Sequence, residues 1–207
     1  MNKLPEKTIG RLSEYRRTLL NCLAKGKTHI YSHELANLHN FTAVQVRRDI
    51  MLIGYSTTLK KGYDVKALID VISKIIDTDE GINAAIIGVG NLGKAITTYF
   101  NGKRPKLRIV ATFDNDPEKA NRVIAGVKCY PISEINKLVN ELDIRIGIMT
   151  VPPENAVSVL ETLVNAGIKG ILNYTSTPLS VPQNVHLEEY DMITSIEKVA
   201  YFVKQKK

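Results

Sequence analysis

Apolar residues recur at helical spacing through the first quarter of the chain. Spacings of three, four and three residues predict an amphipathic helix over residues 8 to 25, built around Leu12, Tyr15, Leu19 and Cys22. A short helix is predicted at residues 33 to 38, with Ser32 as its cap. A tight turn at residues 39 to 41 then leads into a third helix, which runs from Thr42 to about Ile53.

The third predicted helix opens with a capping box. The Thr42 hydroxyl can accept from the amide of Gln45, whose side chain can reach back to the amide of Thr42. At 100 degrees per residue Val46, Ile50 and Ile53 share one face, and the opposite half carries Val44, Arg47, Arg48 and Met51. Helix, short helix, turn and basic helix is the order of a helix-turn-helix, whose second helix enters the major groove of DNA.

Arginine suits that role because its planar fork grips guanine or a phosphate with two hydrogen bonds. Residues 55 to 65 have the β-rich composition and turn residues of a hairpin, which would make this module a winged helix. The alternative is an ordinary three-helix bundle with a solvated arginine pair. The predicted DNA contacts are Arg11, Thr42, Val44, Gln45, Arg47, Arg48, Lys60 and Lys61.

The period of the pattern changes near residue 81. Residues 64 to 80 predict a connecting helix that ends at Gly81. A short apolar strand at residues 84 to 87 is followed at once by the glycine-rich run GVGNLG, residues 88 to 93, and then by a helical stretch. A second apolar strand runs from Leu107 to Phe113 and ends at Asp114. Strand, glycine turn, helix and strand is the order of a βαβ unit.

Each glycine of this run has its own mechanical reason. Gly88 permits a tight turn, Gly90 lets a pyrophosphate approach the backbone, and Gly93 lets the helix pack close to the strand. The helix N-terminus supplies amide donors for phosphates. Asp114, 21 residues after Gly93, can accept both ribose hydroxyls of adenosine and would repel a 2′-phosphate, which favours NAD(H) over NADP(H). The alternative is a purely structural glycine turn.

The pattern continues as βαβ units. Apolar strands are predicted at residues 144 to 150 and 168 to 172, and a final amphipathic helix at residues 192 to 203. Loops after the carboxyl ends of parallel strands line the ligand crevice, so residues 150 to 152 and 173 to 176 should face the nicotinamide. The predicted dinucleotide contacts are Gly88, Val89, Gly90, Asn91, Leu92, Gly93, Asp114, Thr150, Val151, Pro152 and Asn173.

Charge also divides the chain, at about residue 66. The net charge is +7, and residues 1 to 66 hold 12 basic and 5 acidic side chains, so the whole excess lies there. That distribution suggests that the first part meets a polyanion, although a solvated basic surface is the alternative. No run of 18 apolar residues and no signal-peptide core occurs, and the two distant cysteines suggest neither a disulfide framework nor a zinc site. We expect no metal, no membrane and a reducing cytoplasm.

A dehydrogenase usually adds a second domain with a general acid or base, and residues 81 to 191 leave no room for one. His186, in an alternating segment, is expected on an edge strand rather than in a catalytic site. A dinucleotide site without proton-transfer chemistry, joined to a DNA-reading module, indicates a sensor and not an enzyme. Two alternatives stay open: a small NAD-dependent oxidoreductase, and a DNA-binding regulator that responds to a different ligand or to none.

The chain resembles the Rex family of redox-sensing transcriptional repressors. The resemblance covers nearly its whole length, through TAVQVRRDI, IIGVGNLGKA, FDNDPEK, TVPPENA, AGIKGILNY and the closing helix. It implies a homodimer in which the final helix is exchanged between Rossmann domains. It also implies repression of fermentative genes, release from operator DNA by NADH, and competition by NAD+.

The resemblance further implies three domains and a switch. The domains would be a winged helix-turn-helix with a connecting helix at 1–80, a doubly wound parallel-sheet Rossmann domain at 81–190, and a dimerisation helix at 191–207. Tyr99 would lie near the nicotinamide and exchange partners with Arg17 and with Asp191 of the other subunit. The chain departs from the family in its wing, which is poor in glycine, and this affects the minor-groove contact.

Overall fold

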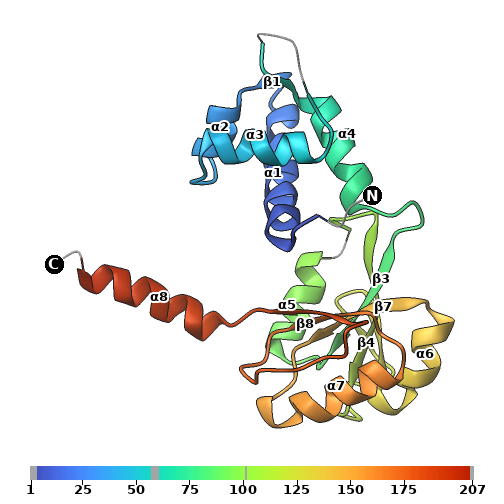
Figure 1. Ribbon diagram of the computed structural model, residues 1–207. Helices are drawn as coiled ribbons and strands as arrows, with labels where there is room; N and C mark the ends of the chain where they lie inside the picture. The colour runs from blue at the N-terminus through green and yellow to red at the C-terminus, as the bar shows by residue number, and fades with distance from the viewer. Residues whose placement is uncertain (1–3, 57–60, 101, 206–207) are drawn as a thin grey trace. The chain divides into compact units, whose positions relative to one another are not determined.

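The computed structural model describes residues 4–56, 61–100 and 102–205. The chain divides into two compact units, Met1–Asp79 and Glu80–Lys207. Figure 1 shows both units and labels most of their helices and strands. No helix within the described ranges is both long and apolar enough to cross a lipid bilayer.

The first unit is helical with a small two-stranded sheet. Its elements are α1 (Glu6–Ala24), β1 (His29–Ile30), α2 (Ser32–Asn37), α3 (Ala43–Leu52), β2 (Tyr63–Asp64) and α4 (Val65–Ile76). The core is formed by apolar side chains from all four helices and β1: Leu12, Tyr15, Leu19, Ile30, Leu35, Val46, Ile50, Leu68 and Ile72. The predicted inner face of α3 is thereby confirmed, since Val46 and Ile50 are buried and Ile53 packs against this core.

A buried charged network ties α3 to α1. Asp49 is fully buried, and both of its carboxylate oxygens accept hydrogen bonds from the Arg11 guanidinium, at 2.6 and 2.7 Å. The Tyr15 hydroxyl and the Gln45 side-chain amide also donate to it, at 3.0 and 2.9 Å. Burial opposes the ionisation of Asp49, but these hydrogen bonds outweigh it and hold the pKa of the carboxyl below its ordinary value. These hydrogen bonds fix the position of α3 relative to α1.

The second unit is a doubly wound α/β domain. Its elements are β3 (Ile82–Ile87), α5 (Asn91–Phe100), β4 (Leu107–Asp114), β5 (Val123–Ile124), β6 (Val127–Pro131), α6 (Ile135–Glu141), β7 (Ile144–Met149), α7 (Ala156–Asn165), β8 (Gly170–Asn173), β9 (His186–Glu189) and α8 (Met192–Gln205). Short 3₁₀ turns, Ile132–Glu134 and Pro153–Asn155, precede α6 and α7. The sheet order is β5-β6-β4-β3-β7-β8-β9, parallel except for β5.

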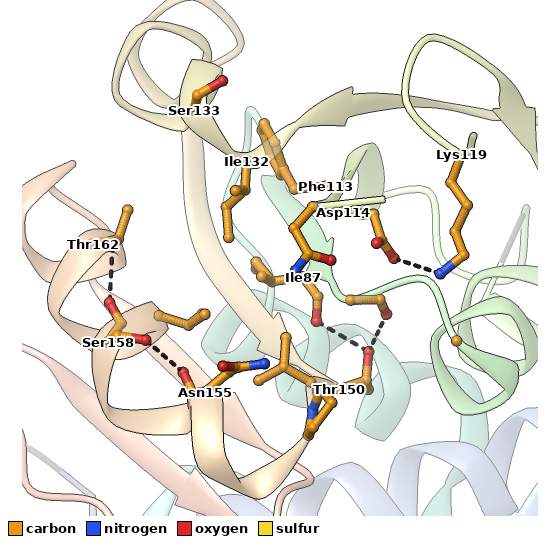
Figure 2. A pocket seen from close by; sticks show the side chains of 16 residues that line it. Ile87, Phe113, Asp114, Lys119, Ile132, Ser133, Thr150, Asn155, Ser158 and Thr162 are labelled. Atoms are coloured by element: carbon orange, nitrogen blue, oxygen red, sulfur yellow. Dashed lines mark hydrogen bonds and ion pairs between the residues drawn. The ribbon is translucent and has the colours of Figure 1, made fainter. Parts of the chain in front are cut away.

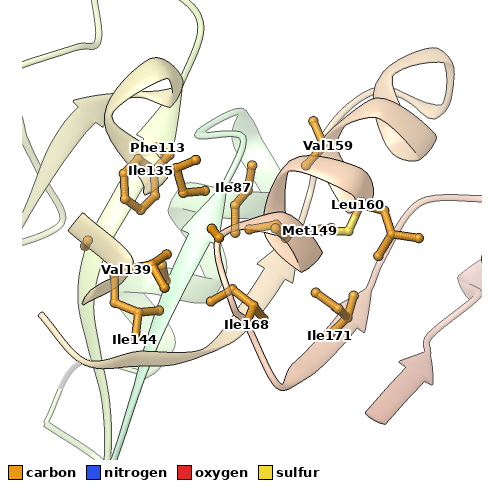
Figure 3. Packing of buried hydrophobic residues seen from close by; sticks show 14 of the residues in the cluster. Ile87, Phe113, Ile135, Val139, Ile144, Met149, Val159, Leu160, Ile168 and Ile171 are labelled. Carbon is orange, nitrogen blue, oxygen red and sulfur yellow. The ribbon is translucent and has the colours of Figure 1, made fainter. Parts of the chain in front are cut away.

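Helices cover the two faces of this sheet unequally. Alternate residues of β3 point to opposite faces. Ala85 and Ile87 belong to one buried cluster with side chains of α6 and α7. Figure 3 shows Ile87 among them. Ala84 and Ile86 face the other side, where Ile96 of α5 packs against them. Among the described helices of the second unit, α5 is the one whose side chain packs in this cluster.

The sheet order places a ligand crevice beside β3. The chain steps from β3 outward to β4, then crosses back to β7 on the other side of β3. Such a reversal separates the loops at the carboxyl ends of the strands and opens a crevice there. The loops after β3, β4 and β7 are three of the four that the sequence assigns to a dinucleotide, the fourth being the loop after β8. His186 lies on the edge strand β9, as predicted.

Several local expectations need correction. The capping box of α3 is half formed: Thr42 accepts from the amide of Gln45, at 3.1 Å, but the Gln45 side chain bonds Asp49 instead of reaching back. The connecting helix spans only Val65–Ile76 because Asp64 caps it by accepting from the amide of Ala67. In the expected hairpin, β2 pairs with β1, and residues 57–60 lie outside the described residues.

We predict that Asp49→Asn destabilises α3 by about 2 kcal/mol at neutral pH, because it leaves a largely buried guanidinium without its countercharge. Since the folded-state pKa of Asp49 is lowered, this stabilisation is complete above the unfolded pKa of about 3.9 and disappears as the pH falls through the folded value. Amide hydrogen exchange of α3 from pH 7 to 3 measures it. Asp70→Asn, on an exposed position of α4, is the control; equal protection in both variants would contradict the prediction.

Candidate functional site

The end of β3 is bound to both neighbouring strands. The Gly88 amide donates to the carbonyl of Phe113 at the end of β4, at 2.8 Å. On the other side, the Thr150 amide donates to the carbonyl of Ile87 at 2.8 Å, and the Thr150 hydroxyl donates to the carbonyl of Gly88 at 2.6 Å. Three strand ends are therefore held at one point, where the glycine loop begins.

The glycines of this loop are required for different reasons. Gly88 has φ of 91°, and a Cβ there would lie 2.8 Å from the carbonyl oxygen of Thr150. Gly93 is buried in the first turn of α5, and its Cβ would collide with the carbonyl oxygen of Gly88. Gly90 has open space where a Cβ would be and lines the pocket described below. Close packing explains Gly88 and Gly93, whereas Gly90 leaves room for a ligand.

Asp114, at the end of β4, is a buried carboxylate with several donors. One oxygen accepts from the amide of Val89 in the glycine loop, at 2.7 Å, and from the Lys119 ammonium, at 3.3 Å. The other oxygen accepts from the amide of Asp116, at 2.9 Å. Burial opposes ionisation, but the hydrogen bonds from Asp116, Val89 and Lys119 lower the pKa of Asp114 below its ordinary value. The carboxylate is therefore charged at neutral pH.

A pocket of about 650 Å³ opens beside Asp114 (Figure 2). It is lined by Ile87, Gly88, Gly90, Phe113, Asp114, Asn115, Lys119, Ile132, Ser133, Thr150, Val151, Pro152, Asn155, Ser158, Val159 and Thr162. Its size lies within the range of small-molecule and cofactor sites. Six of the predicted dinucleotide contacts are among the lining residues: Gly88, Gly90, Asp114, Thr150, Val151 and Pro152.

The other predicted contacts lie beside the pocket or away from it. Val89, Asn91, Leu92 and Gly93 continue the loop into the first turn of α5. The Asn173 side chain is buried and already used, because it donates to the carbonyl of Thr177 and accepts from Thr175. Tyr99 does not line the pocket: its ring is 67% exposed, and the Lys103 ammonium lies 3.4 Å from the ring centroid.

Sequence reasoning missed several lining residues. Lys119 belongs to the FDNDPEK run, but nothing in the local sequence shows that its side chain returns to Asp114. Ser158 and Thr162 lie one helical turn apart on α7, which the sequence marks only as an apolar helix. Figure 2 shows both side chains along the α7 side of the pocket. Ser133 belongs to a stretch for which no element was predicted. The four-residue spacing on α7 was the signal available.

The outer face of α3 is exposed and carries both arginines. Arg47 and Arg48 are exposed, and the neighbouring Val44 and Met51 are 64% and 72% exposed. Large apolar side chains exposed beside paired arginines suit a surface that docks against a partner. The short helix α2 precedes α3 through a turn in which Asn40 has a left-handed φ of 56°. This geometry is that of a helix-turn-helix.

The remaining predicted DNA contacts have mixed surroundings. The Arg11 and Gln45 side chains both bond Asp49, so each has a structural role in holding α3. Thr42 is exposed and caps α3. Lys61 is exposed, and Lys60 lies outside the described residues. The DNA contacts of these residues stay predictions.

The predicted switch residues are exposed. Arg17 projects from α1, whereas the adjacent Arg16 is buried and pairs with Asp77 after α4, at 2.8 Å. Asp191 begins the last helix, where its carboxylate accepts from the amide of Ile193 and from the hydroxyl of Thr194. The exchange of partners among Arg17, Tyr99 and Asp191 stays a prediction.

Comparison with known proteins assigns this architecture. A family model described as CoA binding domain matches residues 79–177, and one described as putative DNA-binding protein N-terminus matches residues 3–50. The redox-sensing transcriptional repressor Rex of Leuconostoc citreum is 38% identical over 201 residues, which are 97% of this chain and 93% of that protein. The chain belongs to the Rex family. The repressor Rex of Carboxydothermus hydrogenoformans is 37% identical and covers 98% of both chains.

Solved structures of the Rex family agree with the fold. A Rex-family repressor named RSP, in complex with β-NAD+ and operator DNA, superposes with a TM-score of 0.90 at 31% identity, covering 100% of this chain and 95% of that chain. RSP in complex with β-NADH gives a TM-score of 0.87 at 30% identity, covering 100% and 97%. The predicted fold class, an N-terminal DNA-binding domain followed by a Rossmann domain, is confirmed.

We predict that Gly90→Ala and Gly93→Ala separate ligand space from packing. Gly93→Ala should lower the unfolding free energy by about 2 kcal/mol, because its Cβ collides with the backbone of Gly88. Gly90→Ala should change it by less than about 0.5 kcal/mol, yet weaken NADH binding about tenfold, because the methyl group fills pocket space. Thermal unfolding and NADH titration measure both. Unchanged NADH affinity in Gly90→Ala would contradict the assignment of the loop.

Proposed function

We propose that this chain is a redox-sensing transcriptional repressor that binds operator DNA through α3 and leaves it when NADH occupies the pocket beside Asp114. The observation that carries the proposal is the presence, in one chain, of an exposed arginine pair on a helix-turn-helix and a Rossmann pocket. Full-length similarity to proteins named as redox-sensing transcriptional repressors supports it. So do the RSP structures with β-NADH and with β-NAD+ and operator DNA.

In the proposed complex α3 enters the major groove. Arg47 and Arg48 would bind base edges or phosphates with two hydrogen bonds each, and Val44 or Met51 would contact a thymine methyl group. Lys60 and Lys61 would meet the backbone next to the groove. The basic excess of the first 66 residues supports this arrangement, because phosphate neutralisation supplies most of the affinity for DNA. We also propose that the protein acts in the cytoplasm, where operator DNA would be its partner.

The residues at the pocket fit a dinucleotide. Gly88, Gly90 and the amides at the start of α5 would hold the pyrophosphate, and the Asp114 carboxylate would accept the adenosine ribose hydroxyls. The loop at residues 150–152 would lie along the bound ligand. Open space beside Gly90 and a charged, buried Asp114 are the features that make the fit specific.

NADH changes DNA binding only if it prefers one state of the protein. Equal affinity for the DNA-competent and DNA-incompetent states would shift nothing. A tenfold to hundredfold release requires about 1.4 to 3 kcal/mol of differential binding, an ordinary size for allosteric coupling. Arg17, Tyr99 and Asp191 are our candidates for the groups that distinguish the two states.

We propose a sensor rather than an enzyme. An oxidoreductase needs a group that transfers protons near the reacting carbon. Of the described residues that line the pocket, Asp114 and Lys119 are the charged ones, and they are paired with each other. His186 lies on the edge strand β9 and does not line the pocket. Turnover of small carbonyl compounds with NADH would favour the alternative.

We also propose a homodimer in which α8 packs on the second copy. The helix is exposed on all sides, including seven large apolar or aromatic side chains: Met192, Ile193, Ile196, Val199, Tyr201, Phe202 and Val203. The sparsely covered sheet face has an apolar cavity of about 240 Å³. Its lining includes Ala84, Ile109, Ile146, Ile148 and Leu172. Exposed apolar surface of this extent marks a protein interface.

Two substitutions should separate DNA binding by α3 from NADH binding in the pocket beside Asp114. DNA is selected from a random pool by the full-length protein, and binding is then followed by fluorescence anisotropy with increasing NADH. Arg48→Ala should weaken DNA binding by about 1 to 3 kcal/mol and leave NADH affinity unchanged. Asp114→Ala should weaken NADH and spare DNA. Arg145→Ala, an exposed arginine of the second unit, is the control. If saturating NADH left the DNA affinity of the wild type unchanged, the proposed function as an NADH-responsive repressor would be contradicted.

Ile196→Glu should dissociate the dimer. The side chain is 69% exposed in the single chain, and burying a carboxylate in an apolar interface should raise the dissociation constant more than about hundredfold. Light scattering over a concentration series measures this. Lys198→Glu, about 200 degrees from Ile196 on the α8 helical wheel, introduces the same group away from Ile193, Ile196, Val199 and Val203 and should stay dimeric. Identical masses for the two variants would contradict the role of α8.

A further inference from the structure

Lys119 occupies an unusual place in the pocket. It lies in a turn after β4, and its ammonium is 3.3 Å from the Asp114 carboxylate and 3.4 Å from that of Asp116 (Figure 2 shows the first contact). Its side chain is partly exposed and reaches the pocket. The backbone holds this turn closed, since the amides of Lys119 and Ala120 both donate to the carbonyl of Asp116. The Lys119 ammonium therefore lies beside the position expected for the adenosine ribose.

The charges of this group decide which ribose it accepts. Asp114, Asp116 and Lys119 together carry a net charge of −1. Ribose hydroxyls can donate to Asp114 without disturbing the ion pair. A 2′-phosphate carries about two negative charges, and the Asp114 carboxylate would repel it. Lys119 would not offset this repulsion, because its ammonium is already paired with Asp114. The same lysine would bind that phosphate well if Asp114 were neutral, because ammonium groups bind phosphates as point charges.

We propose that Lys119 is a phosphate-binding residue held inactive by Asp114, so that this ion pair, rather than Asp114 alone, sets the preference for an unphosphorylated adenosine ribose. The inference rests on the proposed NADH site. Lys119 neutralises half of the local acidic charge, which lets an anionic dinucleotide enter. Asp114 in turn occupies the Lys119 ammonium in an ion pair, so that this ammonium cannot bind a 2′-phosphate. Neutralising Asp114 therefore converts the site toward NADPH only while Lys119 is present.

A double-mutant cycle tests this pairing. Asp114→Asn keeps an oxygen that can accept from the amide of Val89 and so preserves the loop contact. Affinities for NADH, NADPH and the fragment adenosine 2′,5′-bisphosphate are measured on full-length wild type, Asp114→Asn, Lys119→Met and the double variant, with melting temperatures as a check on folding. Lys137→Met, an exposed lysine of α6 outside the pocket, is the matched control for loss of positive charge.

We expect Asp114→Asn to lose about tenfold in NADH affinity and to gain about tenfold in affinity for NADPH and the bisphosphate, the size of one charge-assisted hydrogen bond. The double variant should lack the gain. Lys119→Met should bind NADH more weakly than Lys137→Met does.

A gain that persists in the double variant would overturn the role of Lys119, as would a folded Asp114→Asn that gains nothing. In either case NADH binding by the wild type would leave the proposed function standing. A wild type that binds neither nucleotide would overturn both.

Discussion

Hydrogen bonds between strand ends at Gly88 are the constraint on which the sensor unit depends. The Gly88 amide reaches β4, its carbonyl accepts the Thr150 hydroxyl after β7, and the next amide, that of Val89, reaches Asp114. No side chain can be added at Gly88 without meeting the backbone of Thr150. One point in the fold therefore positions the glycine loop, Asp114 and the loop after β7 together. Such rigidity is what a binding site needs from its scaffold.

The two units reach their anionic partners by different means. Residues 1 to 66 of the first unit hold a basic excess equal to the net charge of the whole chain, and part of it, including Arg47 and Arg48, is exposed, as a surface that meets many phosphates requires. The rest of the chain, residues 67 to 207, has no net charge. In the proposed complex, attraction for phosphate comes from backbone amides at the start of α5, and the charged pocket side chains neutralise each other in part. A ligand that binds there is recognised by shape and by a few fixed donors.

Local patterns within single segments of the sequence predicted most of the fold. Contacts between segments that are distant in the sequence could not be predicted from them. Helical spacing gave the inner face of α3, and the glycine run with Asp114 located the crevice. The Gln45 side chain left its capping box because Asp49, four residues away, is tied to Arg11 on another helix. Lys119 was missed because its importance comes from the turn that brings it back to Asp114. Residues 115 to 143 lack a strong period, since β5 and β6 are short and α6 has seven residues.

The proposed coupling between DNA binding and NADH binding can be measured from the side of the nucleotide, because linkage between two ligands is reciprocal. If NADH weakens operator binding by a given factor, saturating operator must weaken NADH binding by the same factor. The most direct measurement is therefore the dissociation constant of NADH for the full-length protein, alone and with excess operator. We predict that excess operator raises the dissociation constant of NADH by a factor of about ten to one hundred. Equal constants would contradict it, because a ligand indifferent to DNA cannot report redox state to a promoter.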